Sequence, residues 1–371
     1  LRQINSKITT TFVSMSMLCL MLFLAISAFA TGSGLASSVK TDLEDMTKFD
    51  CTFYGLSEKG YQEEQQQKFI KKLDDLGLTI KKDAKEILPI TIYQNGTFRK
   101  CRYKMEPLLK EREKYSDYTK DYVKKLYETP LTFAKLSEYN KIRKAIGEKE
   151  LTLKSDEYIL NCDYGNLIPI MEKAASDKQK LTLDGKTYKM KYGLQKDTYM
   201  VTAAKTDMGT VILNDEIIQS LKIDYSTLYL NLNWKGNAQK VSRKYTEYLK
   251  QMIINSKMPN SLYSATISKE EVYEQSTGLS TIMTYIAIYI GLVFLITCAA
   301  VLALQQLSEN ADNIEKYKLL SKIGTSQKMI NRAIKAQIIL YFCLPLSLAL
   351  IHSYVGTVSY THLTLPTKLE V

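Results

Sequence analysis

The chain has 371 residues, of which 45% are hydrophobic and 24% are charged, and its formal net charge is +11. Lysine and arginine are interspersed with aspartate and glutamate through the long middle of the chain, so this charge indicates a solvated surface and argues against a nucleic-acid partner. The sequence has two histidines and no GxSxG or HExxH motif, which leaves almost no material for a hydrolytic triad or a zinc site. We therefore expect no enzyme activity, no cofactor and no metal.

Three long stretches of the sequence contain no Asp, Glu, Lys or Arg. Their predominantly apolar parts are residues 8–30, 279–304 and 338–356. Each is close to the roughly 20 residues that a helix needs to cross the hydrocarbon core of a bilayer. The mean hydropathy of −0.17 would suit a soluble protein. The distribution of apolar residues instead predicts a membrane protein with three transmembrane helices.

The first apolar stretch has a second interpretation. It is N-terminal, follows Arg2 and Lys7, and ends in small residues such as Ala28 and Ala30, as a secretory signal peptide does. It is longer than the apolar region of about 7 to 15 residues that is typical of such peptides. The sequence also begins with Leu1 rather than Met. We therefore favour a transmembrane helix in a piece of a longer protein.

Charge next to the apolar stretches predicts the topology. Short flanking segments rich in Lys and Arg stay in the cytoplasm, whereas long segments are translocated largely regardless of charge. The leader 1–7 and the polar stretch 305–337 are both short and net basic, so we expect both to be cytoplasmic. The long segment 31–275 is then extracytoplasmic, and it is long enough to form a core of its own.

The first half of this outer segment shows three local patterns. Residues 61–76 have apolar residues at helical spacing, with Phe69, Ile70 and Leu73 on one face. In residues 90–105, Asn95-Gly96 lies between two alternating segments and predicts a β-hairpin with a type I′ turn. Residues 106–128 are charged and rich in tyrosine, and they predict helical structure that could project from the domain.

The second half of the outer segment is typical of a sheet followed by a helix. Residues 181–232 predict several strands, with turns at Asp184-Gly185 and Met208-Gly209, and residues 241–254 predict a helix. Asp184-Gly185-Lys186-Thr187 ends like a phosphate-binding loop, but the position of the first glycine is Lys180 and no helix is expected to follow. We therefore interpret it as a hairpin turn. The whole outer segment is expected to be a large inserted α+β domain.

The six cysteines do not indicate a disulfide scaffold. Cys19, Cys298 and Cys343 lie inside apolar stretches and are most simply small buried hydrophobic residues. The other three are Cys51, Cys101 and Cys162, so at most one disulfide can form outside the membrane. No CxxC spacing is present to suggest a zinc site.

The cytoplasmic stretch 305–337 is the most informative part of the chain. Apolar residues from Ile314 to Ile334 recur at three- and four-residue steps, which predicts an amphipathic helix that continues out of the second span. Gly324 fits the end of this helix, and Thr325 or Ser326 fits the cap of the next one. Two interpretations remain open: a connector that lies on membrane lipid, with its lysines at the headgroups, or a docking surface for a cytoplasmic protein.

Two features near the end of the chain are His352 and the stretch 357–371. His352 lies near the end of the third apolar stretch, where an interfacial imidazole is more common than a residue of a substrate path. Residues 357–367, "TVSYTHLTLPT", resemble the translation of a sequencing adapter. We therefore expect residues 357–371 to be an artefact, the third span to be truncated, and His362 to have no function.

Both ends of the sequence resemble FtsX-like permease subunits of ABC transporters, especially those of the bacitracin-export type. The leader "LRQINSKITTTFVSMSMLCLMLFLAIS" resembles the span that precedes the external domain in that family, and "LSEYNKIRKAIGEKELTLKSDEYIL" (136–160) resembles a segment of such domains. Residues 276–356 resemble the C-terminal membrane region. The motif "EKYKLLSKIG" (315–324) is the most specific part of the resemblance.

The resemblance implies a function and partners. In this family a separate cytoplasmic ATPase subunit docks on coupling elements between spans, and the external domain recognises peptide antibiotics or their lipid-linked cell-wall precursors. A membrane histidine kinase often accompanies the permease. Carried over to this chain, the coupling surface would consist of six residues: Glu315, Tyr317, Leu319, Leu320, Ile323 and Gly324.

Two other functions remain open. The chain could be a membrane-anchored receptor that signals to a histidine kinase without transport. It could also be an FtsX-type regulator of a cell-wall hydrolase, although its large external domain argues against that. Co-purification of an ATPase subunit would distinguish transporter from receptor. The sequence does not identify a ligand site in the outer segment.

Overall fold

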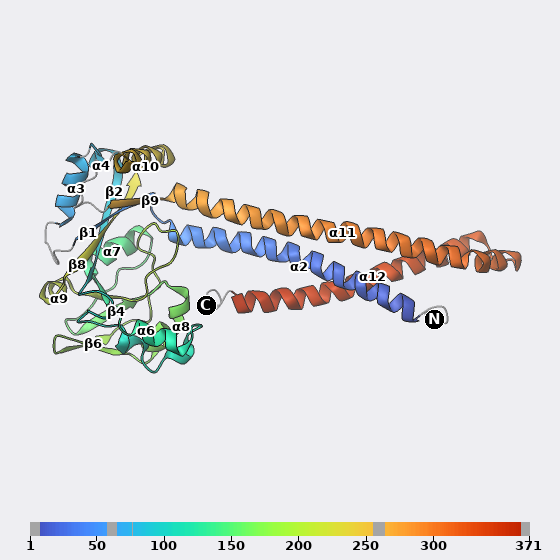
Figure 1. The fold of residues 1–371 in the computed structure, drawn as a ribbon, viewed down its shortest axis with the longest axis horizontal. Helices are drawn as coiled ribbons and strands as arrows, with labels where there is room; N and C mark the ends of the chain where they lie inside the picture. Colours follow the sequence, from blue (N-terminus) through green and yellow to red (C-terminus); the bar gives the residue numbers. More distant parts are fainter. Residues whose placement is uncertain (1–7, 58–64, 76, 255–263, 365–371) are drawn as a thin grey trace. The chain divides into compact units, whose positions relative to one another are not determined.

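A computed structural model of the chain describes residues 8–57, 65–75, 77–254 and 264–364. It divides into two compact units (Figure 1). One unit consists of residues 1–40 and 277–371, and the other consists of residues 41–276. The second unit corresponds closely to the outer segment that the sequence predicts.

The unit of residues 41–276 is built on one nine-stranded sheet. Its strand order is β5-β6-β4-β7-β3-β2-β8-β1-β9. The strands are β1 (Cys51–Ser57), β2 (Ala84–Gln94), β3 (Thr132–Lys135), β4 (Glu157–Asn161), β5 (Lys180–Leu183), β6 (Lys186–Met190), β7 (Thr210–Leu213), β8 (Tyr225–Trp234) and β9 (Ser264–Ser268). The β3–β7 and β4–β6 pairs are parallel and the other pairs are antiparallel. Neighbours in this sheet are mostly distant in sequence, so long-range pairing organises the domain.

Helices pack on this sheet around two hydrophobic cores. At the β1–β8 end, α3 (Gln65–Asp75), α4 (Ile80–Asp83) and α10 (Ala238–Ile254) contribute Leu73, Ile80 and Tyr245 to one core. At the β4–β7 end, α5 (Glu106–Leu109), α6 (Lys120–Leu126) and α8 (Ile168–Ser176) contribute to the other core. The remaining helical elements are η1 (Glu113–Tyr115), α7 (Leu136–Ala145), η2 (Gly165–Leu167) and α9 (Asp215–Ser220). This mixture of elements confirms the predicted α+β class for the unit.

The other unit consists mainly of three long helices. They are α2 (Ile8–Met46), α11 (Lys269–Lys322) and α12 (Gln327–Thr364). α2 continues well past the predicted apolar stretch 8–30, and α12 contains Pro345 within a continuous helix. A small buried cluster of Leu18, Leu22, Cys298 and Ala349 joins the three helices within this unit.

Several local predictions for the outer segment are confirmed. α3 buries Phe69, Ile70 and Leu73, as the helical spacing indicates, although residues 61–64 and 76 of the predicted helix lie outside the described residues. α10 covers the predicted helix 241–254. Asp184 and Gly185 both have positive φ angles and connect the antiparallel strands β5 and β6, which confirms a hairpin turn rather than a phosphate loop.

The predicted β-hairpin over residues 90–105 is wrong. β2 ends at Gln94 and pairs with β8 and β3, and of the two turn residues only Gly96 has a positive φ angle. The carboxylate of Asp224 accepts hydrogen bonds from Asn95 Nδ2 (2.9 Å) and from the backbone N–H of Gly96 (3.2 Å). The Asn-Gly pair therefore closes the end of the β2–β8 pairing, which a local pattern cannot indicate.

The prediction of helical structure over residues 106–128 is confirmed, but the prediction that this segment projects from the domain is wrong. The segment forms three short helices, α5, η1 and α6. Glu111 has a φ angle of 66°, which interrupts the helical path, and the side chain of Thr119 accepts a hydrogen bond from Tyr122 N and caps α6. Leu108 and Val123 are fully buried, so the segment packs on the domain.

Candidate functional site

The C-terminal end of α11 forms a sharp helix stop. The backbone N–H of Thr325 donates to the carbonyl of Leu320 (3.1 Å), and that of Gly324 donates to the carbonyl of Ser321 (3.2 Å). Together with a φ angle of 96° at Gly324, this is the Schellman arrangement in which a left-handed residue ends a helix. The prediction that Gly324 ends the helix is confirmed.

The next helix begins immediately after this turn. The carbonyl of Ser326 accepts hydrogen bonds from the N–H groups of Met329 (2.9 Å) and Ile330 (3.2 Å), which places Ser326 at the N-cap position of α12. The turn between the helices is therefore only a few residues long. A short turn fixes the direction in which the end of α11 leads into α12.

Three of the six predicted coupling residues form one row on α11. Glu315 and Leu319 lie on α11, and Ile323 directly follows its last residue, with its backbone N–H donating to the carbonyl of Leu319 (3.2 Å). The four-residue spacing therefore makes these three residues neighbours on one face. Leu319 and Ile323 are 67% and 74% exposed, which is unusual for large apolar side chains. Leu320 lies beside this row and is 40% exposed.

The other predicted coupling residues have different roles. Tyr317 lies about 200° around the helix from Glu315, and it is only partly exposed. Gly324 supplies the turn and has no side chain to contribute. Sequence reasoning missed Met329, which follows the turn and is 64% exposed. The available signal was an apolar residue inside a polar stretch directly after a helix cap.

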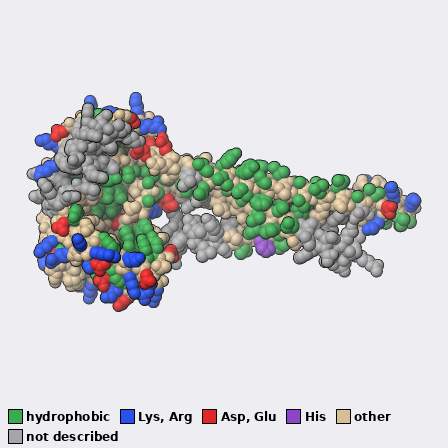
Figure 2. Space-filling model, in the orientation of Figure 1, with side chains coloured by type: hydrophobic (Ala, Val, Ile, Leu, Met, Phe, Trp, Pro, Cys, Tyr) green, Lys and Arg blue, Asp and Glu red, His purple; other side chains and the backbone are tan. Residues whose placement is uncertain are grey.

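Positive charge surrounds this row of residues. Six basic residues lie in the polar stretch 305–337: Lys316, Lys318, Lys322, Lys328, Arg332 and Lys335. Figure 2 shows Lys and Arg side chains gathered at the turn between α11 and α12. Apolar side chains flanked by lysines form a surface that suits either an acidic protein partner or anionic lipid headgroups.

Two of the three long helices contain an apolar part that is long enough to cross a membrane. Among the described residues, Met15–Met46 of α2 and Lys269–Ser308 of α11 are long and apolar enough to cross a bilayer. The apolar part of α12, Cys343–Gly356, is shorter. Along α11, large side chains such as Tyr285 (70%) and Ile296 (61%) are exposed. A continuous exposed apolar surface is what contact with lipid would need.

Within this unit, α2 and α11 approach each other closely. A Cβ atom placed on Gly32 would lie 2.9 Å from the Cβ of Ala287. A Cβ on Gly291 would lie 2.7 Å from the ring of Phe29. Small residues at such contacts allow two helix backbones to approach, as is common between membrane helices.

His352 does not form a site with other polar side chains in the described part of the chain. Its Nδ1 lies 2.8 Å from the carbonyl oxygen of Leu348, one turn earlier in α12. This contact satisfies one ring nitrogen within the helix. It gives no support to a substrate path.

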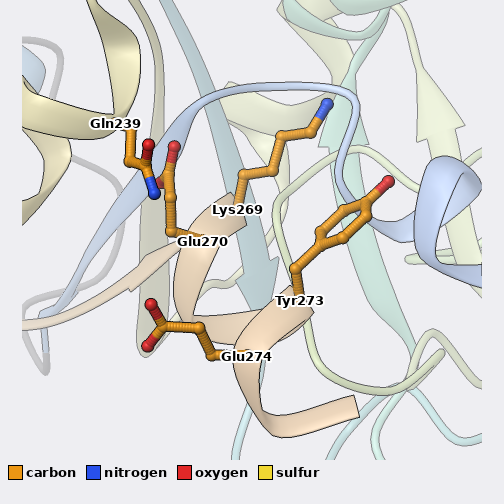
Figure 3. A pocket seen from close by; sticks show the side chains of 5 residues that line it. All are labelled: Gln239, Lys269, Glu270, Tyr273 and Glu274. Carbon is orange, nitrogen blue, oxygen red and sulfur yellow. The ribbon is translucent and has the colours of Figure 1, made fainter. Parts of the chain in front are cut away.

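A small pocket lies where α10 and the first turn of α11 meet in the unit of residues 41–276. It has a volume of about 210 Å³ and is lined by Gln239, Lys269, Glu270, Tyr273 and Glu274 (Figure 3). The Lys269 ammonium lies 5.7 Å from the centre of the Tyr273 ring, and Glu274 forms an exposed ion pair with Arg243 (2.9 Å). Lys269 and Glu274 therefore already have partners, whereas Glu270 Oε2 is buried without a hydrogen-bond partner among the described residues.

The described residues contain no group of three or more His, Cys, Asp or Glu that could hold a metal ion. All six cysteines are free. Burial raises the pKa of the Cys162 thiol, which disfavours its reactive thiolate form. The described residues therefore show no metal-ligand cluster, and Cys162 is not an activated thiol.

Comparison with known proteins identifies three similar permeases. The Bacitracin export permease protein BceB of Bacillus subtilis (strain 168) is 25% identical over 228 residues, which cover 56% of this chain and 34% of that protein. The ABC transporter permease protein YxdM of the same organism is 22% identical over 38% of this chain and 22% of its own length. The Bacitracin export permease protein BceB of Halalkalibacterium halodurans is 31% identical over 24% of this chain and 13% of its own length. No family model matches the chain.

These similarities support an ABC-transporter permease family for the chain. The chain spans about a third of the length of the first of these relatives. Permeases are membrane proteins, which agrees with the membrane class that the apolar stretches predict.

Proposed function

We propose that this chain contributes to the membrane-spanning permease subunit of an FtsX-like ABC transporter. In this proposal residues 31–275 lie outside the cell and recognise a peptide antibiotic or its lipid-linked cell-wall target. Residues 305–337 lie in the cytoplasm and couple to a separate ATPase subunit. The similarity to bacitracin export permeases supports this class of function.

The observation that carries the proposal is the exposed row on α11. Leu319 and Ile323 point out of a polar, lysine-rich helix end. Burying one such side chain contributes about 1.5–3 kcal/mol, so a partner that covers both gains a substantial part of its binding free energy. A protein partner accounts better than lipid for the preceding Glu315, because a carboxylate next to anionic headgroups is unfavourable.

The helix itself provides a physical route for coupling. α11 is a single helix of 54 residues, and the turn after it is fixed by two backbone hydrogen bonds. A helix of this kind moves as a rigid element, so displacement of its cytoplasmic end by an ATPase would displace its apolar part as well. Ligand binding outside would act in the reverse direction through the same element.

A co-purification experiment tests the docking surface. The tagged chain is expressed in Bacillus subtilis, and ABC ATPase subunits that co-purify with it are quantified by mass spectrometry. Leu319→Asp and Ile323→Asp should each reduce the recovered ATPase about 30-fold, the loss expected when a central residue worth about 2 kcal/mol is removed. The matched control is Ser321→Asp, which adds the same charge to the same turn on another face of the helix.

Each outcome of this experiment has a meaning. Loss of the ATPase in the first two variants and its retention in Ser321→Asp supports the docking role. Equal recovery with all three variants contradicts it. Recovery of a histidine kinase without any ATPase from the unsubstituted chain would favour the receptor interpretation.

The proposed ligand class is tested separately. The full chain in detergent micelles is titrated with bacitracin, with a lipid-linked pyrophosphate, and with both together. Saturable binding of any of these, abolished by thermal unfolding of the domain, supports recognition by residues 31–275. The absence of binding in all three titrations contradicts the proposed ligand class and leaves the docking result unaffected.

A further inference from the structure

An irregular segment in the unit of residues 41–276 is buried to an unusual extent. Residues 195–209, here called the strap, connect β6 to β7 without forming a helix or strand. Five of its residues are at most 8% exposed: Thr198, Tyr199, Val201, Thr202 and Asp207. Loops normally run over the surface because their backbone polar groups need partners. The partners of the strap must therefore come from the sheet.

Two side chains at the C-terminal end of β4 bind both ends of the strap. Asn161 Nδ2 donates to the carbonyl of Asp197 (3.0 Å) and to the carboxylate of Asp207 (2.7 Å). The carboxylate of Asp163 accepts from Thr198 Oγ1 (3.0 Å) and from the backbone N–H of Asp207 (2.8 Å). These two side chains alone therefore fix the strap near its beginning and near its end.

The middle of the strap is bound by residues of β1 and β8. The backbone N–H of Val201 donates to Thr52 Oγ1 on β1 (2.8 Å), and Asn231 Nδ2 on β8 donates to the carbonyl of Tyr199 (2.8 Å). Thr52 and Asn231 also hydrogen-bond each other (2.6 Å). The strap consequently links strands that belong to the two separate hydrophobic cores of the domain.

The tip of the strap contacts the last turns of α2. The backbone N–H of Thr202 donates to the carbonyl of Met46 (3.1 Å), which is one of the carbonyls that a helix end leaves without an internal partner. Lys205 Nζ lies 3.7 Å from Asp42 and 3.9 Å from Asp45. The strap therefore connects the sheet to residues 41–46 at the end of α2.

Two buried carboxylates lie close together here: Asp163, which follows β4, and Asp207, which belongs to the strap. Burial, together with the nearby charge of Asp163, raises the pKa of Asp207 to about 7, although hydrogen bonds from Asn161, Thr210 and Gly209 oppose this shift. Burial also raises the pKa of Asp163. The other ionisable groups that face this pair are Cys162, Tyr199 and Tyr229, with Lys196 near Cys162 and Lys205 near Asp163.

We propose that the strap fastens the end of α2 to the sheet when Asp207 is protonated, and that it opens when Asp163 and Asp207 are both charged. Two adjacent buried charges repel each other and lack the water that would stabilise them. Movement of the strap away from β4 hydrates Asp207 and relieves both costs. The same movement breaks the Thr202–Met46 hydrogen bond and separates Lys205 from Asp42 and Asp45.

This device is independent of the proposed transport function, because it depends only on contacts inside residues 41–276. It would make the attachment of α2 to the domain respond to pH near neutrality. Release of residues 41–46 from the strap is a local change of the kind on which switching elements depend.

Hydrogen exchange of the full chain in detergent micelles tests the proposal. The reporters are the amides of Val201, Thr202 and Asp207, each of which donates to a named acceptor, and peptides from β8 serve as the internal reference. After correction for intrinsic exchange, opening of the strap should increase about tenfold between pH 6 and pH 8, as expected for a group that titrates near pH 7. A peptide that covers residues 41–47 should show the same change.

Three variants identify the responsible group. Asp207→Asn should remove the pH dependence, leaving less than about a twofold change. Asp163→Asn should move the midpoint to lower pH, because it removes the neighbouring charge. Asp121→Asn, an exposed carboxylate on α6, is the matched control and should retain the tenfold change.

Several results would overturn the proposal. They are equal opening of the strap at pH 6 and pH 8 in the unsubstituted chain, an unchanged midpoint in Asp163→Asn, and opening that leaves residues 41–47 protected. If Asp207→Asn does not fold, the midpoint of Asp163→Asn decides the question. Folding is checked by the fluorescence of Trp234, the single tryptophan of the sequence.

Discussion

The ring of Phe29 on α2 lies directly against the backbone of α11 at Gly291. A Cβ atom at position 291 would lie 2.7 Å from Cε2 of the ring, closer than such atoms pack in proteins. The contact lies within the unit of residues 1–40 and 277–371, together with the buried Leu22 and Cys298. The approach of these two helices thus depends on the absence of a side chain at Gly291, as it does at Gly32.

The first prediction concerns this contact. Gly291→Leu should lower the stability of the helical unit by about 1–3 kcal/mol, the usual cost of overpacking, and should lower its melting temperature measured by circular dichroism in micelles. Combining Gly291→Leu with Phe29→Ala should recover part of the loss. Gly278→Ala is the control, because no atom lies within 4 Å of a Cβ placed there. Equal effects of the substitutions at positions 291 and 278 would refute the contact.

The second prediction concerns the end of α11. Gly324 has a φ angle of 96°, which costs an L-residue about 1 kcal/mol or more. Gly324→Ala should therefore weaken the helix stop and reduce ATPase recovery, whereas Gly324→Asn should have a smaller effect because Asn tolerates this conformation better. Limited proteolysis between residues 320 and 330 measures the change. Faster cleavage in the Asn variant than in the Ala variant would be inconsistent with this account of the turn.

The third prediction concerns pH and stability. Asp207 has a pKa of about 7 in the folded chain, above its value in the unfolded chain, so its protonated form favours folding. Stability is therefore fully present below about pH 4 and is lost as the pH rises through 7. The raised pKa of the partly buried Glu138, caused mainly by desolvation, acts in the same direction.

Urea unfolding followed by Trp234 fluorescence measures this dependence. Between pH 5.5 and pH 8, Asp207 alone should lower the free energy of unfolding of the unit of residues 41–276 by about 2 kcal/mol. Asp207→Asn should lose most of this slope. A domain that is more stable at pH 8 than at pH 5.5 would show that the sign is wrong.

The sequence predicts the elements whose cause is local. The end of α11 at Gly324, the N-cap at Ser326 and the turn at Asp184-Gly185 all depend on backbone preferences of a few consecutive residues. The amphipathic helices α3 and α10 follow from apolar spacing. These features were recognisable because no distant residue competes for the same backbone groups.

The sequence does not predict the features that depend on distant partners. Asn95-Gly96 has the local signature of a hairpin, but Asp224 binds it and β2 pairs with β8 instead. The strap has no local pattern at all, because its partners Thr52, Asn161 and Asn231 lie on three different strands. Long-range contacts of this kind become visible only when the sheet order is known.

The sequence predicts only part of the candidate docking site. Helical spacing places Glu315, Leu319 and Ile323 on one face, whereas the family resemblance also includes Tyr317, which lies on another face. Met329 belongs to the next helix, α12, and its side chain is exposed. Helical spacing along α11 therefore does not include it.

The central claim of this account is that residues 31–275 lie outside the cell and residues 305–337 lie in the cytoplasm. Lys110→Cys and Lys318→Cys report on the two sides, because Lys110 and Lys318 are both exposed. Intact cells are treated with a membrane-impermeant maleimide, and labelling of the unsubstituted chain is subtracted. We predict that position 110 is labelled in intact cells and position 318 only after permeabilisation. Labelling of position 318 but not of position 110 in intact cells would contradict the account.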